Sequence, residues 1–143
     1  MTELEADNEG AVIETAFFSR TFDEALALTR EARDYLAEYG EEEVRRLPPE
    51  MQLHFSAESM RLTSRLTYVM AWLLAQRAAH QGEIGYDELK DDEWRLGGHD
   101  VCMGTPTVEP AQLPSYLADL LRRSEALFRR VARLDEMMAN APG

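Results

Sequence analysis

Hydrophobic residues recur every three or four positions in three long stretches of this chain, which is the spacing of one face of an α-helix. In the first stretch the apolar positions are Phe22, Ala25, Leu28, Ala32, Tyr35, Leu36 and Tyr39. Thr21 and Glu24 fit a capping box at its start, although Phe17 and Phe18 upstream allow a start about one turn earlier. Gly40 can take a positive φ without a Cβ clash, so we predict that this helix ends there.

The second stretch predicts a helix from about Pro49 to Gln81 that stops at Gly82. One apolar stripe consists of Met51, Phe55, Leu62, Leu66, Val69 and Leu73. A second apolar face lies about 120° away and consists of Tyr68, Trp72, Ala75 and Ala79. A helix with two apolar faces is normally covered on several sides, either by two neighbouring helices or by a second subunit.

The third stretch begins near Pro114 and has the heptad spacing of a helix–helix seam. Its members are Leu117, Leu120, Ser124, Leu127, Val131, Leu134 and Met138. Ser124 is the polar member, and its hydroxyl can bond back to a carbonyl one turn earlier. Between Gly82 and Pro110, glycines and prolines interrupt the pattern, so we predict a long connection with one short helix over residues 86–96.

These elements predict an all-α fold, an antiparallel three-helix bundle with a long crossover loop before the third helix. The bundle should cover residues 15–140 and form one domain, as suits a chain of 143 residues. Residues 1–14 are polar and acidic and are expected to form a flexible arm, and residues 141–143 are expected to start a flexible C-terminal tail.

Charge narrows the classes of partner, because 27 acidic and 15 basic residues give a net charge of −12. A phosphate backbone repels so acidic a protein, so nucleic-acid binding is unfavourable. The longest apolar run, residues 68–75, is far shorter than the roughly 20 residues that span a bilayer, and the N-terminus does not resemble a signal peptide. The lone Cys102 excludes a disulfide scaffold, so we expect a cytoplasmic protein without a membrane contact.

The motifs of serine hydrolases, zinc proteases and phosphate-binding loops do not occur in the sequence. The best candidate for chemistry is the pair His99 and Cys102, as metal ligands or as base and nucleophile. Structural zinc needs four ligands and catalytic zinc three, and His54 and His80 lie on the second helix without evident convergence. We therefore expect no metal, no cofactor and no enzymatic activity, and interpret the segment around His99 as a flexible loop.

Arginine supplies 14 of the 15 basic residues, and its planar guanidinium suits protein–protein contacts. Arg61 and Arg65 lie on roughly the same side of the second helix as Tyr68 and Trp72. This mixture of guanidinium and large aromatic groups is typical of binding hot spots, so the stripe is a candidate partner or dimer surface. The alternative is that it packs inside the fold.

Arg122 and Arg123 flank the seam of the third helix and are also candidates for partner binding. Ordinary ion pairs with Asp119, Glu125 or Asp135 are the expected arrangement for the arginines of this helix. An alternative function is a nucleic-acid-associated regulator that uses this Arg-rich helix.

Three segments of the sequence also resemble a known family. They are FDEALALTREARDYL at residues 22–36, ESMRLTSRLTYVMAWLLAQRAAHQGEI at 58–84, and LPSYLADLLRRSEALFRRVARLDEMM at 113–138. Together they resemble the alphaproteobacterial regulators of CtrA degradation, the RcdA family.

The resemblance implies a homodimeric adaptor in the cytoplasm that is transiently recruited to the cell pole. Such adaptors help the ClpXP protease to degrade the cell-cycle regulator CtrA and other cargo. The implied partners also include the response regulator CpdR, which primes the protease, and the cyclic-di-GMP effector PopA. The resemblance carries no motif that assigns a partner contact to a single residue.

Overall fold

The computed structural model describes residues 2–141, with side chains from residue 16 onward, and within this range the fold is all-helical. The long helices are α1 (Thr2–Tyr35), α3 (Pro49–His80) and α5 (Ser115–Ala139). Shorter elements are the π-helical turn η1 (Leu36–Gly40), α2 (Glu41–Arg45), the 3-10 turns η2 (Glu88–Lys90), η3 (Asp92–Trp94) and η4 (Pro110–Gln112), and α4 (His99–Met103). None of the described helices is long and apolar enough to cross a membrane.

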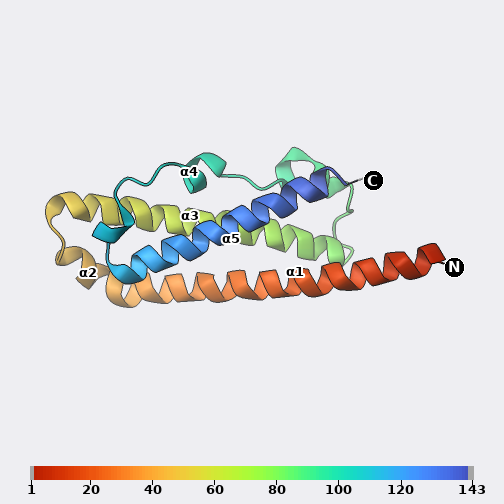
Figure 1. Cartoon of the computed structure of the whole chain (residues 1–143), viewed down its shortest axis with the longest axis horizontal. Helices are drawn as coiled ribbons and strands as arrows, with labels where there is room; N and C mark the ends of the chain where they lie inside the picture. Colours follow the sequence, from red (N-terminus) through yellow and green to blue (C-terminus); the bar gives the residue numbers. More distant parts are fainter. Residues whose placement is uncertain (1, 142–143) are drawn as a thin grey trace.

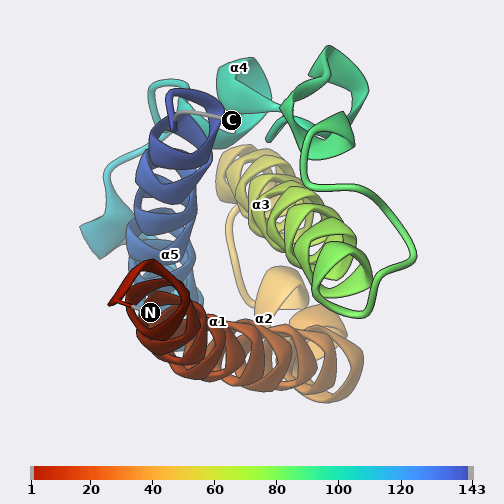
Figure 2. The same ribbon diagram turned by 90° about the vertical axis from the view of Figure 1, so that its right-hand side faces the viewer.

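The long helices lie side by side, and each of them contacts the other two (Figure 1). The segment between α3 and α5 returns along the outside of these two helices, on the side away from α1 (Figure 2). As a result α5 runs in the same direction as α3 and opposite to α1 (Figure 1), and contacts such as Arg65–Ser124 and Trp72–Asp135 advance together along the two helices. The predicted antiparallel arrangement is therefore wrong for α5 relative to α3, because the crossover carries the chain back before α5 begins, whereas α1 and α3 are antiparallel.

The first helix is longer than predicted, since α1 starts at Thr2 and includes the segment expected to be an arm. Residue 1 and most of the predicted tail, residues 142–143, lie outside the described part of the chain. Thr21 is not a cap, because it lies in mid-helix and its hydroxyl donates to the carbonyl of Phe17. Gly40 is not a left-handed terminus either: its φ is −57°, and the chain continues through η1 into α2.

The second long helix agrees closely with its prediction. Pro49 stands at its first position, where a missing N–H costs nothing. Gly82 has a φ of 78° just beyond its end. The amide of Gly82 donates to Ala79 and that of Glu83 to Ala78, which satisfies the last carbonyls of the helix.

The connection between α3 and α5 is more ordered than predicted. The expected helix over residues 86–96 is replaced by the turns η2 and η3, and the glycine-flanked segment expected to be a loop contains α4. Gly98 precedes α4 with a φ of 77°, a left-handed conformation that glycine adopts without a steric penalty.

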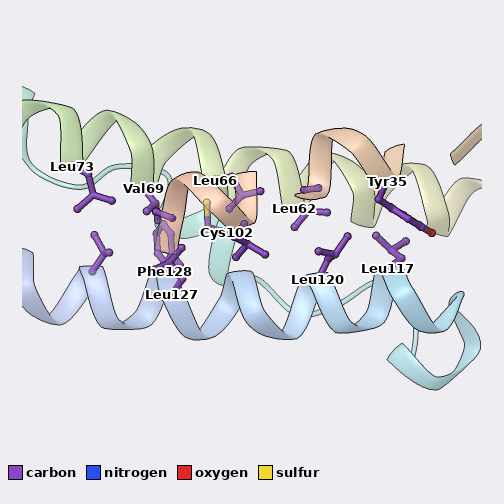
Figure 3. Packing of buried hydrophobic residues seen from close by; sticks show 14 of the residues in the cluster. Tyr35, Leu62, Leu66, Val69, Leu73, Cys102, Leu117, Leu120, Leu127 and Phe128 are labelled. Atoms are coloured by element: carbon purple, nitrogen blue, oxygen red, sulfur yellow. The ribbon is translucent and has the colours of Figure 1, made fainter. Parts of the chain in front are cut away.

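The hydrophobic core lies mainly between α3 and α5 and is closed by α1 (Figure 3). The buried residues include Leu62, Leu66, Val69 and Leu73 of α3 and Leu117, Leu120, Ser124, Leu127 and Val131 of α5. The first apolar stripe predicted for α3 and the heptad seam predicted for α5 therefore face the core. Cys102 of α4 is also fully buried there, so the crossover contributes to the core.

Candidate interaction surface between α3, α5 and the crossover

Three charged residues of α3, Glu58, Arg61 and Arg65, face inward and form what we call the α3 polar cluster. Glu58 is 2% exposed and Arg65 is 4% exposed. Burying ionised groups is unfavourable unless they are paired or hydrogen-bonded. The partners of this cluster therefore explain how the crossover is held.

Arg61 and Glu58 bind the backbone of residues 104–107, the part of the crossover that follows α4. Arg61 donates from Nη1 to the carbonyl of Gly104 and from Nη2 to the carbonyl of Thr105, the latter at 3.0 Å. Glu58 accepts from Arg61 Nε at 3.1 Å and from the Thr107 amide at 3.2 Å. Carboxylate and guanidinium thus satisfy each other while both bind main-chain groups of the crossover.

Arg65 joins three elements. Its Nε donates to the carbonyl of Cys102 at 2.8 Å, and its Nη1 donates to the carbonyl of Leu121 at 3.0 Å and to the Ser124 hydroxyl at 3.2 Å. The Ser124 hydroxyl in turn donates to the Leu121 carbonyl, as its position in the seam predicted. Burial lowers the pKa of Arg65 from its ordinary value, although nearby carboxylates, Glu125 first among them, oppose that effect.

A hollow of about 460 Å³, the α3–α5 hollow, opens beside the α3 polar cluster. Its polar lining consists of Glu58, Arg61, Arg65, Ser115, Asp119, Arg122 and Glu125. Its apolar lining consists of Pro106, Val108, Pro110, Leu113, Ala118 and Leu121. This is the candidate site, because a pocket of this size with apolar walls and a few fixed polar groups suits a bound side chain or ligand.

Farther along α3, Trp72 is 4% exposed and its indole N–H donates to Asp135 at 2.9 Å. Asp135 also accepts from Arg95 Nε, at 3.1 Å and 3.0 Å to its two oxygens. Tyr68 is 39% exposed and covers the turn at Gly98, where a Cβ would clash with its ring. These contacts attach residues 95–98, the part of the crossover that precedes α4, to α3 and α5.

The arginines of α5 are largely engaged in ion pairs. Arg122, with a side chain 73% exposed, pairs with Asp119, and Arg123 pairs with Asp119 and, at 2.7 Å, with Glu31 of α1. Hydrogen bonds from Arg123 and then Tyr116 lower the pKa of Glu31 to about 2. Arg129 and Arg130 pair with Glu125 and Glu24, respectively. Most of these arginines therefore bind carboxylates, as predicted, although Asp135 pairs with Arg95 instead.

The pair His99 and Cys102 lies on α4, but the two side chains face different surroundings. His99 is exposed and its ring packs edge-to-face with that of Phe128, with ring centres 5.5 Å apart, whereas Cys102 is fully buried. Burial raises the pKa of the Cys102 thiol, which disfavours the reactive thiolate. Among the residues that the structure describes, no group of three or more His, Cys, Asp and Glu side chains is placed to hold a metal ion.

Comparisons with known proteins agree with this architecture. A family model described as a protein of unknown function (DUF1465) matches residues 10–142. The crystal structure of RcdA from Caulobacter crescentus CB15 superposes with a TM-score of 0.71 and is 36% identical in sequence, over 87% of this chain and 92% of that one. The chain belongs to the DUF1465 family and is RcdA-like. No curated protein matches this DUF1465 protein.

In this DUF1465 protein the six predicted surface residues divide into two groups. Arg65 and Trp72 are buried and Arg61 nearly so, which favours the alternative that their stripe packs inside the fold. Tyr68, Arg122 and Arg123 remain partly or largely accessible. Of these six, the α3–α5 hollow brings together Arg61, Arg65 and Arg122.

In this DUF1465 protein Glu58 is not among the residues predicted from the sequence, where it occurs only within a segment that carries the family resemblance. The signal was its spacing, since Glu58, Leu62, Arg65 and Val69 alternate by four and three positions along the core-facing side of α3. A charged residue in such a series must find a partner inside the fold. Gln76 continues the same series and is also buried.

Proposed function

We propose that this protein is a non-enzymatic adaptor that promotes degradation of the cell-cycle regulator CtrA, and of other cargo, by the ClpXP protease. The observation that carries the proposal is the likeness to RcdA, at 36% identity over 87% of the chain. This identity and coverage support a role for this protein that is related to that of RcdA.

The chemistry of the described residues supports a role in binding rather than in bond breaking. Cys102 is buried with a raised pKa, and the charged groups of the α3 polar cluster bind backbone carbonyls and the Thr107 amide. The accessible features are instead a hollow with apolar walls and charged rims, which suits recognition of another protein. An adaptor accelerates delivery by holding cargo and protease together and so raising their effective concentration.

The proposed assembly contains a homodimer of this chain, the ClpXP protease with primed CpdR, the effector PopA, and CtrA as cargo. We place it in the cytoplasm, with transient recruitment to the cell pole. The alternative of nucleic-acid binding by α5 has less support, because Arg122, Arg123, Arg129 and Arg130 already pair with carboxylates.

The test is a reconstituted degradation reaction with ClpXP, CpdR, PopA with cyclic-di-GMP, and purified CtrA. Adding this protein should shorten the half-life of CtrA several-fold, while a cargo that ClpXP degrades without an adaptor should be unaffected. An unchanged CtrA half-life would contradict the delivery role. Light scattering on the protein alone tests the homodimer separately, with a monomer mass as the contrary outcome.

A further inference from the structure

Arg65 is a buried cation whose hydrogen-bonding capacity is not fully used. Its Nε and Nη1 donate to Cys102, Leu121 and Ser124. Its Nη2 donates no hydrogen bond to the described residues, and the nearest carboxylate oxygen, Oε2 of Glu125, is 4.0 Å away. Nη2 is not completely enclosed, and Arg65 lines the α3–α5 hollow, so this N–H group can donate to an acceptor that enters the hollow.

The other charged groups that line the α3–α5 hollow have closer partners. Glu58 pairs with Arg61, Asp119 pairs with Arg122 and Arg123, and Glu125 pairs with Arg129 at 2.8 Å. Arg65 is therefore the lining cation whose ion pair is longest. The three acidic and three basic side chains of the lining balance in number, so a carboxylate would be recognised by the free N–H group of Arg65 and not by an excess of positive charge.

The apolar lining favours a protein ligand over a free ion. Pro106, Val108 and Pro110 come from the crossover, while Ala118 and Leu121 come from α5. These side chains form the wall that a neighbouring apolar side chain can contact. Two or more negative charges fit poorly, since Glu58, Asp119 and Glu125 also line the hollow.

We propose that the α3–α5 hollow binds an extended segment of a partner protein, with a single carboxylate on Arg65 Nη2 and an adjacent apolar side chain against the prolines and Val108. This names the chemistry of a contact for the adaptor function proposed above. The proposed site depends on the adaptor function in one respect, namely that its ligand is a protein.

The proposal can be tested by nuclear magnetic resonance on the full chain, without protease or cargo. The probe is a capped peptide with one aspartate between two leucines, and its matched control has asparagine in place of aspartate. The aspartate peptide should shift the amide signals of residues 107–108 and 118–125 saturably. The asparagine peptide should bind about tenfold more weakly, because a charged acceptor forms the stronger hydrogen bond.

Two variants separate this site from the rest of the surface. Ala118→Trp places a large side chain in the hollow without removing Arg65, and should abolish the shifts while the thermal midpoint shows that the protein is folded. Arg122→Glu should weaken binding several-fold through repulsion at the rim. Arg133→Glu makes the same charge change on the same helix outside the hollow, and should bind like the unchanged protein.

Sodium acetate distinguishes a free anion from a peptide. It should shift the same signals at a concentration about tenfold higher, because it lacks the apolar contact. Equal binding of acetate and the aspartate peptide, equal binding of the two peptides, or shifts outside the hollow would overturn the proposal. Failure here leaves the degradation assay unaffected, so the proposed function is judged independently.

Discussion

At the scale of single residues, polar groups placed inside an apolar core determine which contacts of this protein are specific. Trp72 and Asp135 illustrate this, since the indole N–H and Arg95 together satisfy a carboxylate that is 5% exposed. Removing one member of such a group leaves the others unsatisfied, which costs more than the hydrogen bond itself contributes.

We predict that Trp72→Phe lowers the free energy of unfolding by about 2 kcal/mol, through the lost hydrogen bond to Asp135 and the smaller ring. Trp94→Phe is the matched control, because Trp94 is only partly buried. Urea denaturation followed by the remaining tryptophan measures both. A cost for Trp72→Phe no larger than that for Trp94→Phe would show that Asp135 is satisfied without the indole.

A second residue-scale prediction concerns pH. The pKa of Glu31 is lowered to about 2 in the folded protein, so its ion pair with Arg123 stabilises the fold above the ordinary pKa of 4.5 and is lost as pH falls toward 2. Because the pair is about one-third exposed, Glu31→Gln should cost only about 0.5 kcal/mol at pH 7. Thermal melts should show this difference shrinking between pH 4.5 and pH 2.5, and a difference independent of pH would refute the assignment.

At the scale of the elements, hydrophobic spacing predicted α3 and α5 well because their buried faces follow the helical repeat over many turns. The predicted start of α1 is too late, since Thr21 and Glu24 match a capping box but the helix continues through them. Local signals of this kind are weak when the residues upstream can also be helical.

The direction of α5 could not be predicted in the same way. A heptad seam specifies which face is buried and leaves open whether the helix runs parallel or antiparallel to its neighbour. The crossover, residues 81–114, determines the direction of α5. It is long enough to return along α3, because its extended length far exceeds the roughly 38 Å length of the 25-residue α5. The contacts of Arg61 and Arg65 with residues 102–105 hold this connection against α3, and they join positions too distant in sequence for periodicity to reveal.

The turn before α4 gives a prediction at this scale. Gly98→Ala should destabilise the protein more than Gly82→Ala, although both glycines have nearly the same positive φ. The backbone penalty, about 1 kcal/mol, is common to both, but only at Gly98 would the added Cβ meet the ring of Tyr68.

A double-mutant cycle checks the cause. Combined with Tyr68→Ala, the substitution Gly98→Ala should cost about as much as Gly82→Ala does in the unchanged protein, as measured by urea denaturation. If Gly98→Ala costs the same with and without the tyrosine ring, the clash is not what restricts this turn.

At the scale of the whole molecule, charge is the dominant property. A net charge of −12 opposes compaction through self-repulsion, and many of the ion pairs in the described structure are exposed and individually weak. We predict that raising the ionic strength from about 0.01 M to about 0.1 M increases the thermal midpoint at pH 7, since the Debye length falls from about 30 Å to about 10 Å.

The same titration near the isoelectric point of about 4.6 is the control, because little net repulsion remains there to be screened. The rise in midpoint should then be much smaller. A midpoint that falls with salt at pH 7 would mean that the ion pairs between α1 and α5 outweigh the repulsion of the excess acids.

Polar side chains of α3 hold residues 102–107 of the crossover by main-chain groups, which affects how this segment can change in evolution. Arg61 and Arg65 bind backbone carbonyls, which every residue has, and Glu58 binds the backbone N–H of Thr107. At position 107 only proline would lack this N–H. The side chains of Pro106 and Val108 alternate with these anchored positions and line the hollow. Substitutions at 106 and 108 can therefore alter which ligand is accepted while the loop keeps its path, much as a fixed framework carries variable recognition loops.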